Sequence, residues 1–535
     1  MTMPTQGPVT DSPAPMAHRE IMEALAGLLL GLFVAMISST IVTNALPTIV
    51  ADVGGGESTY TWVITSSLLA TTASTPIWGK LADLMSKKAL IQIGLATFVV
   101  GSVLAGLSQN VGELIAARTI QGLGAGGLTA LVQVIMAAMI APRERGRYSG
   151  YIGVSYAVAT VAGPLLGGLV TGTSWLGWRW CFFIGVPVAA LAFVVLQKTL
   201  HLPVVTRKVT IDYLGATLIT AAVSLLLVWV SLGGDVFAWA SWQTATMVPG
   251  ALVLGALFIW TEARAAEPII PLGLFRHRTV VLSTVASACV GVAMFGTTVF
   301  LSQYFQVARG ASPIESGLMT LPLIAGLTLA STISGRIITA TGRWKYFLVA
   351  GSLLITVGLA LLGTARYDTP YPLLSVYMLL TGAGLGMSMQ NLVLAVQNAV
   401  TLSELGTGSS IVAFCRSLGG AIGVSALGAL LGARVPGYVA DGLRTLGAPA
   451  TISGSGVPDL DTLPGPVRLV IQQAYGHATG DLFLAAAPLA LVAFGATLLL
   501  RETRLRSRHD AAPTTEPAAA PVPVPVPDEV APPVR

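Results

Sequence analysis

Charged side chains are rare inside the long apolar segments of this sequence, and two of them are arginines. Arg118 and Arg416 lie within hydrophobic runs, where an ionised group is costly unless it faces a cavity or has a partner. Glu113 lies five residues before Arg118, and Gln121 lies three residues after it, on roughly the same helix face. A carboxylate beside an arginine could bind and release protons, so Glu113 and Arg118 are the first candidates for proton coupling. Arg416 has no acid in its run, and we leave a packing role and a functional role open.

A further carboxylate, Asp83, lies in the segment GKLADLMSKK (79–88). A carboxylate there could accept hydrogen bonds from the N-terminus of another helix, where the helix dipole is positive. Such a latch, made in one conformation only, would bias an equilibrium between two states. We predict that Gly79, Asp83, Lys87 and Arg143 form a conformational latch, with Asp83 as the second candidate for proton coupling. The alternative is an ordinary loop whose charges stay in water.

Uncharged polar side chains interrupt the apolar runs, most densely in AMISSTIVTNALP (35–47). They could line a cavity for an amphiphilic compound, or they could simply form hydrogen bonds between helices, each worth about 0.6–2 kcal/mol in a membrane. Our candidates for a substrate cavity are Ser38, Thr40, Asn44, Trp62, Gln121, Tyr304, Gln306, Gln390 and Asn391.

Residues for enzyme chemistry are missing from the sequence pattern. Cys181, Cys289 and Cys415 are widely spaced within or beside apolar runs, which predicts neither a metal site nor a disulfide framework. The apolar runs offer no cluster of His, Asp or Cys for a membrane enzyme, and no G-x-x-x-x-G-K-[ST] loop indicates an ATP-driven pump. We expect no enzyme activity, no cofactor and no metal.

The elements that must position these residues are membrane helices. Hydrophobic residues make up 54% of the chain, charged residues make up 10%, and the mean hydropathy is +0.77. Soluble domains carry about 25% charged residues, and a helix needs about 20 apolar residues to cross a bilayer. The sequence therefore predicts an all-α integral membrane protein whose partner is the lipid bilayer.

Fourteen spans can be read from the apolar runs. They begin near Ile21, Tyr60, Ala89, Val111, Tyr148, Trp180, Ile211, Thr244, Val280, Gly317, Tyr346, Leu373, Gly408 and Leu482. An even number puts both termini on one side, and the loops on that side carry 21 of the 29 Lys and Arg residues, against six opposite. The positive-inside rule then predicts a multi-pass protein of the plasma membrane with both termini in the cytoplasm. The net charge of +5 reflects this bias and does not indicate nucleic-acid binding.

The chain contains an internal repeat that suggests two homologous halves. The segment that begins at Gly79 has a degenerate copy, GRIITATGRWK, that begins at Gly335, and GPLLGG ending at Gly168 resembles RSLGG ending at Gly420. The offsets, 256 and 252, nearly agree, and a twofold repeat of helices is typical of alternating-access carriers. We predict a cytoplasmic tail (1–20), a six-helix half (21–200), two extra helices (201–264), a second six-helix half (265–501) with a long outer loop (434–479), and a disordered Pro-rich cytoplasmic tail (502–535).

Several motifs in order resemble one family. They are GKLADLMSKK, RTIQGLGAGG (118–127), AGPLLGG (162–168), WRWCFFIGVP (178–187) and FLSQYFQVARGASPIESGLMTLP (300–322). Together they resemble the major facilitator superfamily, in its fourteen-helix drug:proton antiporter branch of the EmrB/QacA multidrug efflux type. The resemblance implies the major facilitator fold, a latch at Asp83 that closes the cytoplasmic side, and an antiporter motif at Gly163, Pro164, Gly167 and Gly168.

One departure from the family pattern affects the function. The first helix of that branch commonly has an Asp where this sequence has Ser38, so the usual proton-binding group is missing. The resemblance still implies secondary-active efflux of hydrophobic or amphiphilic small molecules, such as drugs, by alternating access as a proton antiporter, with antibiotic resistance as a consequence. The alternatives are a dedicated exporter of an endogenous natural product or lipid, and an uncoupled facilitator. We expect a monomer, and the Gly- and Ala-rich composition suggests a bacterial source.

Overall fold

The computed structural model describes residues 18–53, 57–173, 176–202, 212–234, 236–265, 267–446 and 464–505. The two predicted cytoplasmic tails lie almost wholly outside these residues. Within them the chain is helical apart from loops and one isolated β-bridge between Gly233 and Phe237. Thirteen helices in the described part are long and apolar enough to cross a membrane, so the prediction of an all-α membrane protein is confirmed.

The N-terminal half supplies six of the predicted spans. Its helices are α1 (His18–Asp52), α2 (Glu57–Leu84), α3 (Lys87–Leu107), α4 (Val111–Met139), α5 (Pro142–Gly172), α6 (Trp180–Phe183) and α7 (Gly185–Thr199). One of them, α2, is not among the thirteen. Its polar side chains bond to α4, where Thr71 donates to the Gly122 carbonyl (3.0 Å) and the Trp78 indole donates to the Leu123 carbonyl (3.0 Å).

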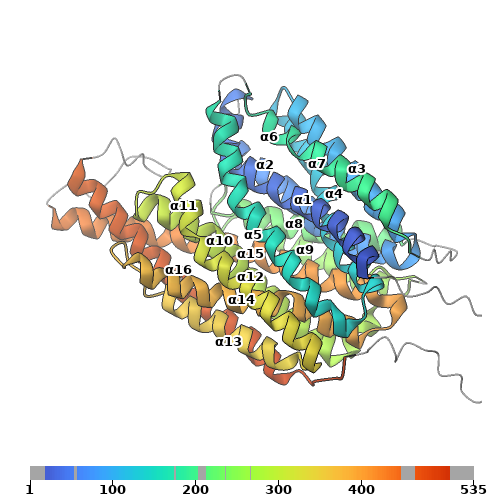
Figure 1. Ribbon diagram of the computed structural model, residues 1–535. Coiled ribbons are helices and arrows are strands. Elements are labelled where there is room, and N and C mark those ends of the chain that lie inside the picture. Colours follow the sequence, from blue (N-terminus) through green and yellow to red (C-terminus); the bar gives the residue numbers. More distant parts are fainter. Residues whose placement is uncertain are drawn as a thin grey trace, which may run out of the picture.

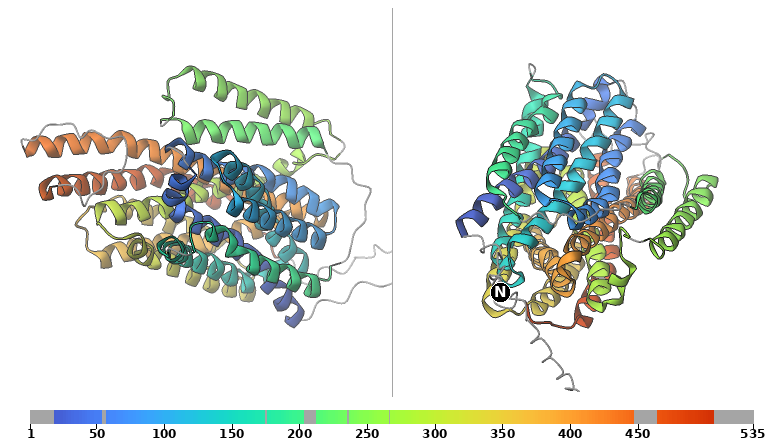
Figure 2. Two further views of the ribbon diagram at one scale, coloured as in Figure 1. Left: turned by 90° about the horizontal axis from the view of Figure 1, so that it is seen from above. Right: turned by 90° about the vertical axis from the view of Figure 1, so that its right-hand side faces the viewer.

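Two further helices, α8 (Tyr213–Leu232) and α9 (Trp242–Glu262), separate the halves in the chain. They form a hairpin that stands at the side of the molecule (Figure 2) and packs through α8 against α2 and α15. Large apolar side chains of α9, among them Trp242 (73% exposed) and Leu252 (69% exposed), point away from the protein, as expected for a surface that faces lipid.

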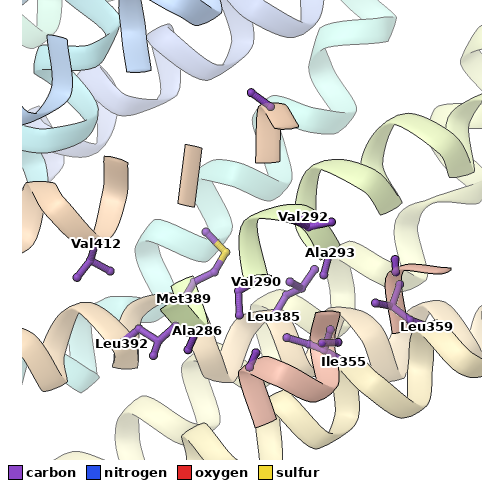
Figure 3. Packing of buried hydrophobic residues seen from close by; sticks show 14 of the residues in the cluster. Ala286, Val290, Val292, Ala293, Ile355, Leu359, Leu385, Met389, Leu392 and Val412 are labelled. Atoms are coloured by element: carbon purple, nitrogen blue, oxygen red, sulfur yellow. The ribbon is translucent and has the colours of Figure 1, made fainter. Parts of the chain in front are cut away.

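The C-terminal half follows the hairpin. It contains η1 (Leu272–Arg276), α10 (Arg278–Gln303), η2 (a π-helix, Tyr304–Ala308), α11 (Pro313–Met319), α12 (Leu321–Thr341), α13 (Lys345–Leu362), α14 (Tyr371–Ala399), η3 (Leu402–Glu404), α15 (Leu405–Thr445) and α16 (Gly465–Leu499). Its interior is packed with aliphatic side chains from α10, α13, α14 and α15, including Val290, Ile355, Leu385 and Val412 (Figure 3).

The two halves form two helical bundles that meet along α5 with α12 and along α2 with α15 (Figure 1). Short polar side chains fix where several helices begin. Ser86, Asn110 and Ser241 each accept a hydrogen bond from a backbone N–H in the first turn of α3, α4 and α9, a contact worth about 1 kcal/mol per helix.

The predicted outer loop at 434–479 is mostly helical, so its extent was wrong. The helix α15 continues to Thr445 and α16 begins at Gly465, well before the predicted start near Leu482, and both project beyond the other helices (Figure 2). Contacts between the two helices stabilise the extension, since the Tyr438 hydroxyl donates to Asp481 (2.7 Å) and its ring lies 5.6 Å from that of His477. Residues 447–463 lie outside the described part.

Candidate functional site

The halves cross twice at the end of the molecule that carries Lys80, Arg143 and Lys345, which we call the basic end. At the first crossing α2 meets α15, and a Cβ on Gly79 would lie 2.0 Å from the Ser410 hydroxyl oxygen. At the second crossing α5 meets α12, and a Cβ on Gly146 would lie 2.3 Å from the Gly335 carbonyl oxygen. Contacts this close exclude any side chain, so the absence of a Cβ lets the two pairs of backbones touch.

The two crossings are related by the sequence repeat. Gly79 and Gly335, which begin the two copies of the repeated segment, each lie at a crossing, on α2 and α12. Gly406 of α15 faces Gly79, as Gly146 of α5 faces Gly335. The repeat found in the sequence therefore corresponds to a symmetric pair of contacts that closes one end of the protein.

Asp83 connects α2 to α15 at the first crossing. Its carboxylate accepts hydrogen bonds from the backbone N–H of Gly406 (2.7 Å), from the backbone N–H of Thr407 (2.8 Å) and from the Thr407 hydroxyl (2.8 Å). These donors lie at the N-terminus of α15, where the helix dipole favours an anion. Lys87, at the start of α3, is close enough to interact electrostatically with Asp83.

The second crossing has no carboxylate in the corresponding place, because Thr339 stands 256 residues after Asp83. Here Arg143 of α5 donates to the carbonyl oxygens of Thr339 (3.3 Å) and Ala340 (3.2 Å) at the end of α12. The four predicted latch residues are thus at the basic end, but Arg143 acts at the second crossing and does not contact Asp83.

A buried polar cluster between the two crossings was not predicted. Arg145, 5% exposed, donates to the carbonyls of Ile140 and Ala137 (2.7 Å each) and to the Gln397 side chain of α14. Gln397 donates in turn to the Ser409 hydroxyl (2.8 Å) and the Gln133 carbonyl (3.4 Å). The position of α14 beside α5 makes Arg145 a contact between the halves.

Gln390 and Asn391, two of the predicted cavity residues, line a cavity of about 10 Å³ together with Gln133 and Arg145. That space is enough for about one water molecule. In this state they belong to the closed basic end and leave no room for a larger compound.

A second buried network joins Ser38 to Arg118 inside the N-terminal half. The Gln121 amide donates to the hydroxyls of Ser38 (3.0 Å) and Ser102 (2.8 Å), and its oxygen accepts from the guanidinium of Arg118. Arg118 also donates to the Val63 carbonyl (3.3 Å). Gln121 therefore links Arg118 to Ser38, the position at which the family that this sequence resembles commonly has an Asp. Ser102, which completes the network, was not predicted.

Glu113 does not pair with Arg118, so the predicted proximity of the two was wrong. Because α4 begins at Val111, Glu113 lies in the first turn, where it is exposed. Its carboxylate accepts hydrogen bonds from the backbone N–H of Gln109 (2.9 Å) and from the Asn110 amide (2.8 Å). The carboxylate therefore stabilises the N-terminus of α4 and does not contact Arg118.

Most other predicted cavity residues form hydrogen bonds within or between helices. Thr40 donates to the Ala159 carbonyl (3.2 Å), and Tyr304 donates to the Arg366 carbonyl (2.5 Å). Gln306 donates to the Ser302 hydroxyl (3.0 Å), and Asn391 donates to the Met387 carbonyl (2.7 Å). Trp62 is half-buried in α2, and the side chain of Asn44 lies outside the described part.

The predicted antiporter motif lies in α5. A Cβ on Gly163 would lie 2.0 Å from the Thr40 hydroxyl oxygen, so this glycine allows α1 and α5 to pack closely. Gly167 is buried, Gly168 is exposed, and the side chain of Pro164 lies outside the described part. The packing role of the motif is thus visible at Gly163.

Known proteins share this sequence and this architecture. Residues 28–424 match the model of the Major Facilitator Superfamily. The multidrug transporter protein MdtP of Bacillus subtilis is 34% identical over 84% of this chain and 80% of its own, and the efflux pump dotC of Dothistroma septosporum is 33% identical over 91% and 84%. The structure of the proton:xylose symporter XylE superposes with a TM-score of 0.59 at 14% identity over 88% of this chain and 95% of that chain. The chain therefore belongs to the Major Facilitator Superfamily, and it is a multi-pass membrane transporter rather than an enzyme.

Proposed function

We propose that this transporter exports hydrophobic or amphiphilic small molecules from the cytoplasm by alternating access. The names of the multidrug and efflux relatives support export. The observation that carries the mechanism is the pair of glycine crossings with the Asp83 latch at the basic end. The positive-inside rule favours a cytoplasmic basic end. A state closed there is the one that would release cargo to the outside, and parting of the two crossings would admit cargo from inside.

We further propose that inward proton movement drives export, with Asp83 as the coupling carboxylate. Its three hydrogen bonds run from α2 to α15, so they can exist only while the halves are joined. The proton affinity of Asp83 must then differ between the two states, and that difference links proton binding to the conformational equilibrium. In this proposal Arg118 does not bind or release a proton. Its hydrogen bond to Gln121 would serve only to stabilise α4.

One observation favours a second candidate, an uncoupled facilitator. The network of Ser38, Ser102, Gln121 and Arg118 contains no carboxylate, and the hydroxyl of Ser38 does not ionise near neutral pH. If Asp83 acts only as a latch, the carrier would run on the gradient of its cargo.

Transport from proteoliposomes with an imposed pH gradient separates these candidates. The probes are ethidium, dansyl-undecanoic acid and the methyl ester of that acid, which are cationic, anionic and neutral. We expect at least one probe to leave faster than from empty liposomes, and its rate to rise when the gradient is imposed. If no probe moves faster, the export proposal is wrong. If a probe moves at a rate that ignores the gradient, proton antiport is wrong and the facilitator remains.

Changing Glu113 to Gln is expected to leave the dependence on the pH gradient intact, with transport rates within about twofold of the wild type. The carboxylate is exposed and caps α4, and a glutamine oxygen can keep one of its two hydrogen bonds, so the loss of stability should stay near 1 kcal/mol. The same proteoliposome assay measures this. Loss of the gradient effect in this variant, with the probe still bound, would restore Glu113 as the coupling acid.

A further inference from the structure

Arg416 lies well inside the long helix α15, in a position that the mechanism above does not use. It follows the start of α15 by eleven residues and is 8% exposed. Its backbone is pressed against α10, because a Cβ on Gly291 would lie 2.0 Å from the Arg416 carbonyl oxygen. The backbone of α15 is therefore held in place against α10 at this residue.

The guanidinium of Arg416 is incompletely bonded. Its Nη1 atom is buried and has no hydrogen-bond partner in the described part of the chain. The buried guanidinium groups of Arg118 and Arg145 differ, because each bonds to a glutamine oxygen and to backbone carbonyls. A buried cation with a free N–H donor is unfavourable, so a ligand that supplied an acceptor and a negative charge would be strongly favoured.

The position of Tyr156 places this group at the interface between the halves. Tyr156 belongs to α5 of the N-terminal half and lies close enough to Arg416 to interact electrostatically with it. Its ring packs against the hydrophobic cores of both halves. The guanidinium therefore lies near the interface between the two halves.

Two of the helices that pack against α15 carry no acid that could compete for Arg416. The sequences of α10 and α14 contain neither Asp nor Glu, and the next acid along α15 is Asp441. Among the described residues, no carboxylate forms an ion pair with Arg416. The group is thus a permanent positive charge in a nearly apolar part of the membrane.

We propose that Arg416 binds the carboxylate or sulfonate group of an amphiphilic cargo, so that anionic amphiphiles are the preferred substrates. This proposal rests on the export function proposed above. The apolar body of the cargo would contact the surrounding aliphatic side chains, and its anionic group would take the free Nη1 donor. A charge-assisted hydrogen bond of this kind is among the strong ones.

The test compares dansyl-undecanoic acid with its methyl ester, which has the same body without the charge. Binding is measured by dansyl fluorescence to the full-length protein in phosphatidylcholine nanodiscs, with empty nanodiscs subtracted. The wild type is expected to bind the acid at least about tenfold more tightly than the ester. The R416Q variant should lose that preference and leave the affinity for the ester within twofold, and R416K should keep part of it. Arg444→Gln is the matched control, because Arg444 is exposed at the outer end of α15.

Equal binding of acid and ester by the wild type would overturn the proposal without any variant. An equal loss of both probes in R416Q would also overturn it, because a purely structural arginine would act that way. The outcome is separable from that of the export proposal. A preference for the acid without any transport in proteoliposomes would leave the anion site in place and would reject export.

Discussion

Changing Gly146 to Val is expected to reduce transport by at least about 100-fold. A Cβ at this position would lie 2.3 Å from the Gly335 carbonyl oxygen and 3.1 Å from its Cα, and valine adds two methyl groups beyond that Cβ. Because the obstacle is backbone, no rotation of a side chain can relieve it, so α5 and α12 must move apart. The basic end can then no longer close. The measurement is probe efflux in proteoliposomes, together with maleimide labelling of a cysteine at Ser334.

The labelling separates a transport defect from misfolding. Ser334 is 1% exposed at the closed second crossing, so a cysteine there should react slowly in the wild-type background and faster in Gly146→Val. Gly495→Val is the matched control, because a Cβ on Gly495 of α16 would meet nothing within 4 Å. Normal efflux by Gly146→Val would show that transport does not require this crossing to close.

Changing Asp83 to Asn is expected to shift the conformational equilibrium by about 10- to 100-fold toward the state that is open at the basic end. The amide has nearly the shape of the carboxylate but no negative charge for the N-terminus of α15, and only its oxygen can accept the donors of Gly406 and Thr407. Lost charge-assisted hydrogen bonds and a lost dipole interaction together amount to about 1.5–3 kcal/mol. The measurement is maleimide labelling of a cysteine at Ser410, which is 0% exposed beneath Gly79.

Two controls sharpen this experiment. Asp441→Asn removes an exposed carboxylate from the far end of α15 and should leave labelling unchanged. Gly79→Val should expose the cysteine as strongly as Asp83→Asn or more, because it blocks the same crossing sterically. Unchanged labelling in Asp83→Asn, with increased labelling in Gly79→Val, would mean that the crossing matters and that the latch does not.

One prediction that the structure contradicts concerns two side chains of the same helix. The pairing of Glu113 with Arg118 assumed that helical spacing alone brings two side chains together. In the structure Glu113 lies in the first turn of α4 and caps it, and Arg118 turns to Gln121 and Val63. The start of this helix at Val111 was predicted, but a carboxylate in a first turn bonds to the groups just before the helix, here Gln109 and Asn110, and the spacing to Arg118 does not show this.

The end of α15 and the start of α16 are a second place where the prediction from the sequence failed. Its Gly and Pro content favoured a loop over 434–479, and Pro436 lies inside the helix nevertheless. Two long helices that leave the membrane side by side can stabilise each other by contacts such as that of Tyr438 with Asp481. Such packing outweighs local propensity, and it cannot be read from one segment at a time.

By itself, the sequence determined the membrane class, the repeat, and the starts of twelve of the fourteen spans to within four residues. It did so because a bilayer requires long apolar helices, and because each of the two backbone crossings requires a glycine, at Gly79 and at Gly335. Only the tertiary structure decided which groups meet: Arg145 with Gln397, Arg118 with Ser38 through Gln121, and Arg416 with the interface at Tyr156. A charge within a span indicates function, but several of the groups that it contacts lie on other helices, and the packing of the helices determines which ones.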